Sequence, residues 1–221
     1  MASFWQRRSK KVLVDIDTQI DLLNHYNGLE PDTLLRHLRR IMAWARINKI
    51  PVISTSLAVP PDISANTTNN FPAICTEGTP GQNKLGYTLL PSHIYFEANN
   101  STDLPENLLN HYQQIIFEKR GVDTFLQPRA DRLLTSYTAD EFIVIGTGIE
   151  TAVHKTVLGL LSRGKNVSVV TDAISGESKM GCQLSLRKMA AKGAILKETA
   201  EITGKSRLNG AAQYYAKKLS I

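Results

Sequence analysis

The fold of this chain is decided by residues 143–156, IVIGTGIETAVHKT. The opening run, Ile143 to Ile145, is apolar and β-branched, which is typical of a buried strand. Gly146 and Gly148 follow without a long loop, and an amphipathic helical pattern comes next. A strand that enters a helix through a tight glycine turn presents backbone N–H groups at the carboxyl end of a parallel sheet, where α/β folds bind ligands. Function therefore depends on what faces this turn, and His154 is its most unusual residue.

Strands and helices alternate along most of the sequence. Apolar, β-branched runs predict strands at 11–17, 50–55, 93–97, 114–118, 141–145, 166–171 and 194–196. Helical periodicity and capping residues predict helices at 32–48, 104–112, 130–137, 151–163 and 177–192. This alternation is typical of a three-layer α/β/α domain, and we expect a mostly parallel six-stranded sheet with Rossmann-like topology. Residues 56–90, rich in Pro, Asn and Gly, are expected to form a long functional loop.

Length and charge favour one domain at 11–200, a basic N-terminal extension at 1–10 and a basic C-terminal tail or helix at 201–221. The chain has 221 residues and a formal net charge of +6. Basic residues gather at both ends and on one face of the predicted helix at 32–48. No nucleic-acid-binding motif accompanies them, so we interpret them as solvated faces. Nucleic-acid binding would instead need one continuous positive surface that joins both ends to this helix.

The sequence also bears on the cellular setting. No apolar run approaches the roughly 20 residues of a membrane helix, and the N-terminus lacks the apolar core of a signal peptide. The two cysteines, Cys75 and Cys182, have no metal-binding spacing and fit a reducing compartment. We therefore expect a cytoplasmic protein without a membrane partner.

Polar groups follow three of the predicted parallel strands. Asp17 ends the first strand, Lys119 directly follows the strand at 114–118, and the glycine turn leads to His154. The carboxyl ends of parallel strands meet at one crevice of a doubly wound sheet. A carboxylate, an ammonium group and the N–H groups of a helix start would together suit hydrolysis, although each alone is compatible with an ordinary solvated terminus.

Ordered motifs resemble those of the isochorismatase-like, or cysteine hydrolase, superfamily. Residues 17–22, DTQIDL, look like its Asp-x-Gln-x-Asp motif, and residues 78–81, GTPG, look like one of its loops. Residues 118–120, EKR, resemble its lysine motif, and residues 148–151, GIET, resemble its nucleophile turn. The resemblance runs in order from residue 11 to residue 196. It implies an isochorismatase-like fold, a small-molecule substrate and a homo-oligomer, either a dimer or a tetramer.

The resemblance also implies roles for individual residues. Asp17 would be the acid/base and Lys119 its cationic helper, while the family's catalytic thiol would stand where this chain has His154. The family commonly has a cis peptide in the turn. Here that bond would join Ile149 to Glu150 and aim the backbone N–H groups of Glu150 and His154 at an oxyanion.

The metal pattern of nicotinamidase-like relatives is missing from this sequence. Those relatives have an Asp-x-His pair and further His residues after the second strand, whereas residues 54–62 contain no His. The remaining histidines are scattered without ligand spacing. The resemblance therefore implies neither a metal nor another cofactor, and we do not expect nicotinamidase activity.

Loss of the thiol leaves two interpretations open. In the first, the chain hydrolyses a small amide, ester or vinyl ether with water activated by Asp17 and His154, while Lys119 offsets negative charge. Isochorismatases proper, for comparison, hydrolyse a vinyl ether without a thiol. In the second, His154 only fills space and the chain is an inactive binding or scaffold protein. Cys75 is a weaker candidate for a displaced nucleophile, because no strand-to-helix turn would activate its thiol.

Overall fold

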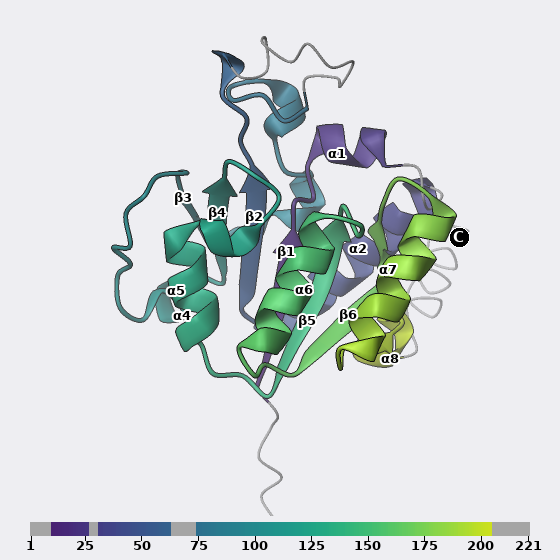
Figure 1. The fold of residues 1–221 in the computed structure, drawn as a ribbon. Helices are drawn as coiled ribbons and strands as arrows, with labels where there is room; N and C mark the ends of the chain where they lie inside the picture. The colour runs from purple at the N-terminus through teal and green to yellow at the C-terminus, as the bar shows by residue number, and fades with distance from the viewer. Residues whose placement is uncertain (1–9, 27–30, 63–73, 205–221) are drawn as a thin grey trace, which may run out of the picture.

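The computed structural model describes residues 10–26, 31–62 and 74–204. The predicted N-terminal extension, apart from Lys10, and the predicted tail beyond residue 204 lie outside the described residues. A central parallel sheet lies between two layers of helices (Figure 1). Within the described part of the chain, no helix is long and apolar enough to cross a membrane.

The sheet has seven strands in the order β3-β4-β2-β1-β5-β6-β7, and all neighbouring strands run parallel. The strands are β1 (Lys11–Ile16), β2 (Val52–Leu57), β3 (His93–Phe96), β4 (Gln114–Lys119), β5 (Glu141–Thr147), β6 (Val167–Ser175) and β7 (Ile195–Lys197). The expected α/β/α architecture is confirmed, but the expected number of six strands is wrong. Both edge strands pair with the sheet despite their shortness, since β3 has four residues and β7 only three.

Helices cover both faces because successive strand side chains point to opposite sides of the sheet. Val12 and Phe142 belong to one core, which α4 (Leu108–His111), α5 (Pro128–Ser136), α6 (Ala152–Ser162) and α7 (Lys179–Ala191) cover. Leu13 and Ile143 belong to the other core, which α2 (Pro31–Ile47) and α8 (Thr199–Thr203) cover. Figure 1 shows the first group in front of the sheet and the second behind it. Helix α4 is shorter than the helix predicted at 104–112.

Short elements line the carboxyl edge of the sheet. They are α1 (Ile20–His25) and the 3₁₀ turns η1 (Pro80–Gln82) and η3 (Thr124–Leu126), whereas the 3₁₀ turn η2 (Gly86–Thr88) packs against α2, and its Thr88 carbonyl accepts from Gln114 at the start of β4. Much of the expected loop at 56–90 is therefore built from short turns, and residues 63–73 of it lie outside the described residues.

Strands β1 and β5 approach each other closely at this edge. A Cβ atom at Gly146 would overlap the carbonyl oxygen of Ile16, and Gly146 has a φ of +138°. Only glycine accepts both conditions readily. The register between β5 and β6 shifts between Val144 and Gly146, just before β5 enters the turn. This contact places the turn beside the end of β1.

Candidate active site

Asp17 stands just past the end of β1 in a left-handed backbone conformation, with a φ of +50°. This conformation is uncommon for a non-glycine residue and persists only where neighbours hold it. The Asp17 N–H donates to the carbonyl of Thr55 on β2 at 3.2 Å. The Asp17 carbonyl accepts from the hydroxyl of Thr147 on β5 at 2.6 Å. The strands on both sides of β1 thus fix the residue that carries the candidate acid/base.

Lys119, the last residue of β4, forms an ion pair with Asp17. Its Nζ lies 2.6 Å from Asp17 Oδ2 and also donates to the Gly121 carbonyl at 2.9 Å. The second carboxylate oxygen, Asp17 Oδ1, accepts from the Thr55 hydroxyl at 2.6 Å. Asp17 and Lys119 are each only 2% exposed. Their attraction is therefore screened far less than that of a surface pair.

The turn after β5 brings backbone N–H groups to the same edge of the sheet. The N–H groups of Thr151 and Val153 both donate to the Gly148 carbonyl at 3.0 Å. The N–H groups of Glu150 and His154 donate to no described backbone acceptor. Such unsatisfied donors are characteristic of the first turn of a helix and suit an incoming anion or oxyanion.

The expected cis peptide between Ile149 and Glu150 is wrong, because every described peptide bond is trans. Hydrogen bonds on both sides hold the trans turn in place. The Ile149 N–H donates to the Ser175 carbonyl of β6 at 2.9 Å. The Glu150 carboxylate accepts from the N–H groups of Glu177 and Ser178, just before α7, at 3.2 and 3.3 Å. The Glu150 side chain therefore braces the turn against α7.

His154 lies beside α7 rather than on the face of α6 that is buried against the sheet. Val153 occupies that buried face, whereas His154 is half-buried. Burial, and then the positive charge of Lys188 on α7, lower the pKa of His154, which favours a neutral imidazole at pH 7. No contact within the described structure joins this imidazole to Asp17 or Lys119. The structure brings Asp17 and Lys119 to the edge of the sheet that holds the turn. The His154 imidazole takes no part in the hydrogen bonds of that pair.

Cys75 lies within electrostatic reach of the ion pair. It is fully buried with a φ of +54°, and its N–H donates to the Asp21 carboxylate at 2.8 Å. Burial, then the negative charges of Asp21 and Asp17, raise the pKa of Cys75 to about 12, against an opposing effect of Lys119. Cys75 is therefore a protonated thiol at neutral pH, which is a poor nucleophile.

Three further residues hold the site, and sequence reasoning did not single them out. Thr55 and Thr147 fix Asp17, as described above. Tyr26 follows α1, and its hydroxyl lies against Gly148 of the turn. Burial raises the pKa of Tyr26, so its hydroxyl remains a donor. Only Thr55 carried a sequence signal, as a hydroxyl at the carboxyl end of a predicted strand.

Metal-binding side chains do not gather in the part of the chain that the structure describes. No group of three or more His, Cys, Asp or Glu side chains is placed to hold a metal ion there.

Comparison with protein families places this geometry in context. The Isochorismatase domain model matches residues 11–201, which include all seven strands. A search of curated protein sequences found no match.

Solved structures share the fold at low sequence identity. MAR1 ribonuclease from Caenorhabditis elegans is 20% identical with a TM-score of 0.61, and the match covers 88% of this chain and 80% of that one. YcaC from Escherichia coli, described as an octameric hydrolase of unknown specificity, is 15% identical with a TM-score of 0.64, covering 89% and 78%. Pyrazinamidase of Pyrococcus horikoshii, solved in complex with zinc, is 18% identical with a TM-score of 0.67, covering 86% and 99%. At these identities the likeness shows the fold alone.

Proposed function

Because this chain belongs to the isochorismatase family, a family of hydrolases, we propose that it hydrolyses a small amide, ester or vinyl-ether substrate without a thiol nucleophile. One observation carries the proposal: the buried pair in which Lys119 Nζ lies 2.6 Å from Asp17 Oδ2. This pair stands at the carboxyl edge of a parallel sheet, where α/β folds bind their ligands. The pyrazinamidase and hydrolase activities named for structures of the same fold support the reaction class.

In the proposed reaction, Asp17 accepts a proton from water as the water attacks the substrate carbonyl. The N–H groups of Glu150 and His154 donate to the oxyanion that develops on the carbonyl oxygen. Lys119 offsets the added negative charge, and Asp17 then returns its proton to the leaving group. For a vinyl ether, Asp17 would first take up a proton from solvent and deliver it to the double bond. Water would then add to the resulting cation and return a proton to Asp17, and the hemiketal would break down to a carbonyl compound and an alcohol.

The His154 imidazole enters the proposal as a second base. Its lowered pKa favours the neutral form, which is the form that accepts a proton from water. Because no described contact joins it to Asp17, we expect loss of the imidazole to cost less activity than loss of the Asp17 carboxylate.

A hydrolase substrate screen tests this proposal. Wild type, Asp17→Asn and His154→Ala are compared on amides, esters and vinyl ethers of small size. We expect Asp17→Asn to lower kcat by at least about 100-fold and His154→Ala to lower it less. Lys155→Ala is the matched control, because Lys155 is an exposed residue next to His154 on α6. Activity that Asp17→Asn leaves unchanged would refute the site.

The second candidate function is that of an inactive binding or scaffold protein. Both Asp17 and Lys119 are almost fully buried, and both Asp17 carboxylate oxygens already have hydrogen-bond donors. A purely structural ion pair has the same features. In that case no substrate is turned over, and Asp17→Asn changes only the melting temperature.

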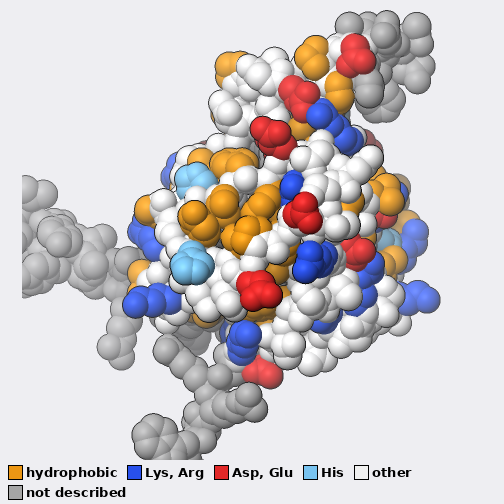
Figure 2. Space-filling view, turned by 90° about the vertical axis from the view of Figure 1, so that its left-hand side faces the viewer, with side chains coloured by type: hydrophobic (Ala, Val, Ile, Leu, Met, Phe, Trp, Pro, Cys, Tyr) orange, Lys and Arg blue, Asp and Glu red, His pale blue; other side chains and the backbone are white. Residues whose placement is uncertain are grey.

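We also propose that the chain forms a homo-oligomer in the cytoplasm. Figure 2 views the molecule from the β3 edge, where hydrophobic side chains gather in the middle of the face. Tyr95 on the edge strand β3 is 43% exposed. Exposed apolar groups on an edge strand are typical of an interface. Light scattering after size-exclusion chromatography measures the oligomeric state.

The proposed cytoplasmic location is supported by the free thiols of Cys75 and Cys182, which fit a reducing compartment.

A further inference from the structure

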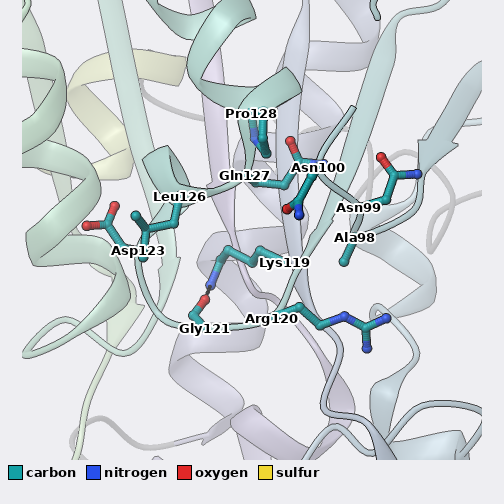
Figure 3. Close-up of a pocket in the computed structure, with 10 residues that line it drawn as sticks. All are labelled: Ala98, Asn99, Asn100, Lys119, Arg120, Gly121, Asp123, Leu126, Gln127 and Pro128. Carbon is teal, nitrogen blue, oxygen red and sulfur yellow. Dashed lines mark hydrogen bonds between the residues drawn. The ribbon is translucent and has the colours of Figure 1, made fainter. Parts of the chain in front are cut away.

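A cavity of about 240 Å³ lies between α7 and β6, separate from the pocket beside Lys119 that Figure 3 shows. Its lining is mostly apolar and includes Ile174 of β6 and Leu186 of α7. The exposed side chains of Lys179 and Gln183 on α7 also line it. The volume lies below the roughly 300–1,000 Å³ of small-molecule sites. The cavity therefore suits one large apolar side chain better than a whole ligand.

The outer face of α7 carries a row of residues at helical spacing. The row recurs at intervals of four, three and four residues, which keeps it on one side of the helix, and comprises Met180, Leu184, Arg187 and Ala191. Met180 is 80% exposed and Leu184 is 51% exposed. The register pairs Leu196 of β7 with Val169, which belongs to the core that α7 covers, so Leu196 faces the same side of the sheet as α7. Leu196 is 39% exposed, and the apolar surface thus continues from α7 to the end of the sheet that lies opposite β3 (Figure 1).

Positive charge surrounds this row. Between Glu177 and Glu198 the sequence contains no Asp or Glu, and its cations are Lys179, Arg187, Lys188, Lys192 and Lys197. Lys197 is paired with Glu141. None of the other four cations forms an ion pair with a carboxylate of the described residues. Uncompensated charge of one sign around an exposed apolar row favours a partner of the opposite sign.

The cavity and the charges together narrow the kind of partner. A second copy of this face would bring like charges together, which disfavours self-association through α7. A nucleic acid would meet the cations but has no aliphatic side chains to bury on Met180 and Leu184. A lipid surface would meet both, but it has no side chain of defined shape for the cavity. An acidic peptide segment supplies carboxylates, apolar contacts and one side chain that the cavity can anchor, as buried anchors do in protein interfaces.

We propose that α7 binds an acidic, amphipathic helical segment of another protein. One large apolar side chain of that segment fills the cavity, and its other apolar side chains pack on the outer row of α7. Its carboxylates pair with Lys179 and Lys188, which flank the row on opposite sides. This binding is separate from the proposed hydrolysis, because neither Asp17 nor Lys119 lines the cavity.

A synthetic peptide tests the proposal. It is a helix-forming peptide of Glu and Ala in which Leu, Phe and Leu recur at spacings of four and three residues. One control peptide replaces every Glu with Gln, and a second replaces Phe with Ala. Fluorescence anisotropy of the labelled peptide measures its Kd for the full chain, and the amide signals of ¹⁵N-labelled protein locate the site. Vesicles of phosphatidylcholine and phosphatidylserine, mixed seven to three, test the membrane alternative.

We expect the acidic peptide to shift the amide signals of α7 with saturation, and to bind more weakly as the salt concentration rises. Each control peptide should bind at least roughly fivefold more weakly, because it lacks either the carboxylates or the side chain for the cavity. These comparisons use the unaltered protein, so they hold even if a variant of α7 does not fold.

Two variants of the protein remove the two kinds of contact. Lys179→Gln/Lys188→Gln and Met180→Ser/Leu184→Ser should each weaken binding of the acidic peptide by roughly fivefold or more. The matched controls are Arg36→Gln/Arg46→Gln and Ile47→Ser, which remove two exposed cations and an exposed apolar side chain from α2. Both controls should leave the Kd unchanged.

The proposal is overturned if the α7 signals do not shift, if either control peptide binds as tightly as the acidic one, or if the α2 variants weaken binding as much as the α7 variants. Vesicle binding that depends on the α7 residues, without peptide binding, would assign this face to a membrane surface instead. Asp17→Asn should leave the peptide Kd unchanged, so a failure of the proposed hydrolysis has no effect on this test.

Discussion

Lys84 and Asp15 form a second buried ion pair, two residues before Asp17 on β1, with Lys84 Nζ 2.9 Å from Asp15 Oδ2 and both side chains fully buried. Lys84 Nζ also donates to the Thr18 hydroxyl at 2.9 Å, and the Ser54 hydroxyl donates to Asp15 at 2.9 Å. The pair fastens the turns at 80–88 to the sheet directly beside the candidate active site. Its two charges are buried together, so each depends on the other.

Lys84→Met is expected to destabilise the protein by about 3–5 kcal/mol, because it leaves the Asp15 carboxylate buried without a cation. Urea denaturation measures the free energy of unfolding. The double variant Asp15→Asn/Lys84→Met should recover part of this loss, since neither charge then remains. Lys155→Met, at an exposed position, is the control. A loss in Lys84→Met no larger than in the control would contradict this role.

Gly146→Ala is expected to destabilise the protein by roughly 3 kcal/mol or more, since the new Cβ would overlap the Ile16 carbonyl and the φ is unfavourable for alanine. Gly86→Ala is the matched control, because a Cβ at Gly86 meets no atom within contact distance. Thermal unfolding of both variants compares them. Equal melting temperatures would show that β1 and β5 do not approach as closely as described.

Glu141 at the start of β5 gives the stability a defined dependence on pH. Burial raises the pKa of Glu141, but hydrogen bonds from Lys197 and Ser168, together with the charge of Lys11, outweigh burial and lower the pKa below its ordinary value of 4.5. The resulting stability is present above pH 4.5 and is lost as the pH falls through the folded-state pKa.

Glu141→Gln should therefore cost roughly 1.5–3 kcal/mol at pH 7 and much less below the folded-state pKa. Urea denaturation of wild type and variant across the acid range measures the difference. A difference that stays constant as the pH falls would contradict the assignment of this effect to the Glu141 carboxylate.

Both thiols are expected to resist alkylation in the native protein. The pKa of Cys75 is raised to about 12, and burial, followed by the charge of Glu150, raises the pKa of Cys182 to about 11. Almost no thiolate is then present at pH 7, and thiolate is the reactive form. Iodoacetamide at pH 7 should leave the intact mass and any hydrolase activity unchanged over a time in which the denatured chain takes up two labels. Rapid single labelling with loss of activity would instead identify a thiol nucleophile.

Several features of the fold could be predicted because they depend on local patterns. Apolar β-branched runs and helical periodicity located all seven strand segments and the helices α2, α4, α5, α6 and α7, but not the short helices α1 and α8, since side-chain periods of 2 and 3.6 are local properties that need several residues to show. The predicted number of six strands in the sheet was wrong, because tertiary contacts decide whether a strand as short as β7 pairs with the edge of the sheet. The cis bond expected after Ile149 came from family resemblance, and the hydrogen bonds of Ile149 and Glu150 hold a trans turn instead.

The sequence by itself determined the strand–turn–helix at 143–156 and placed a polar residue after each of the strands that end at Asp17 and Lys119. Because neighbouring parallel strands end at the same edge of a sheet, the parallel sheet brings Asp17 and Lys119 to one edge. Only the tertiary structure decided that Lys119 pairs with Asp17 and that Cys75 faces the same charges as a protonated thiol. These relationships join residues that are far apart in the chain through hydrogen bonds and burial. Such contacts have no period along the sequence, so they appear only when the loops have packed against the sheet.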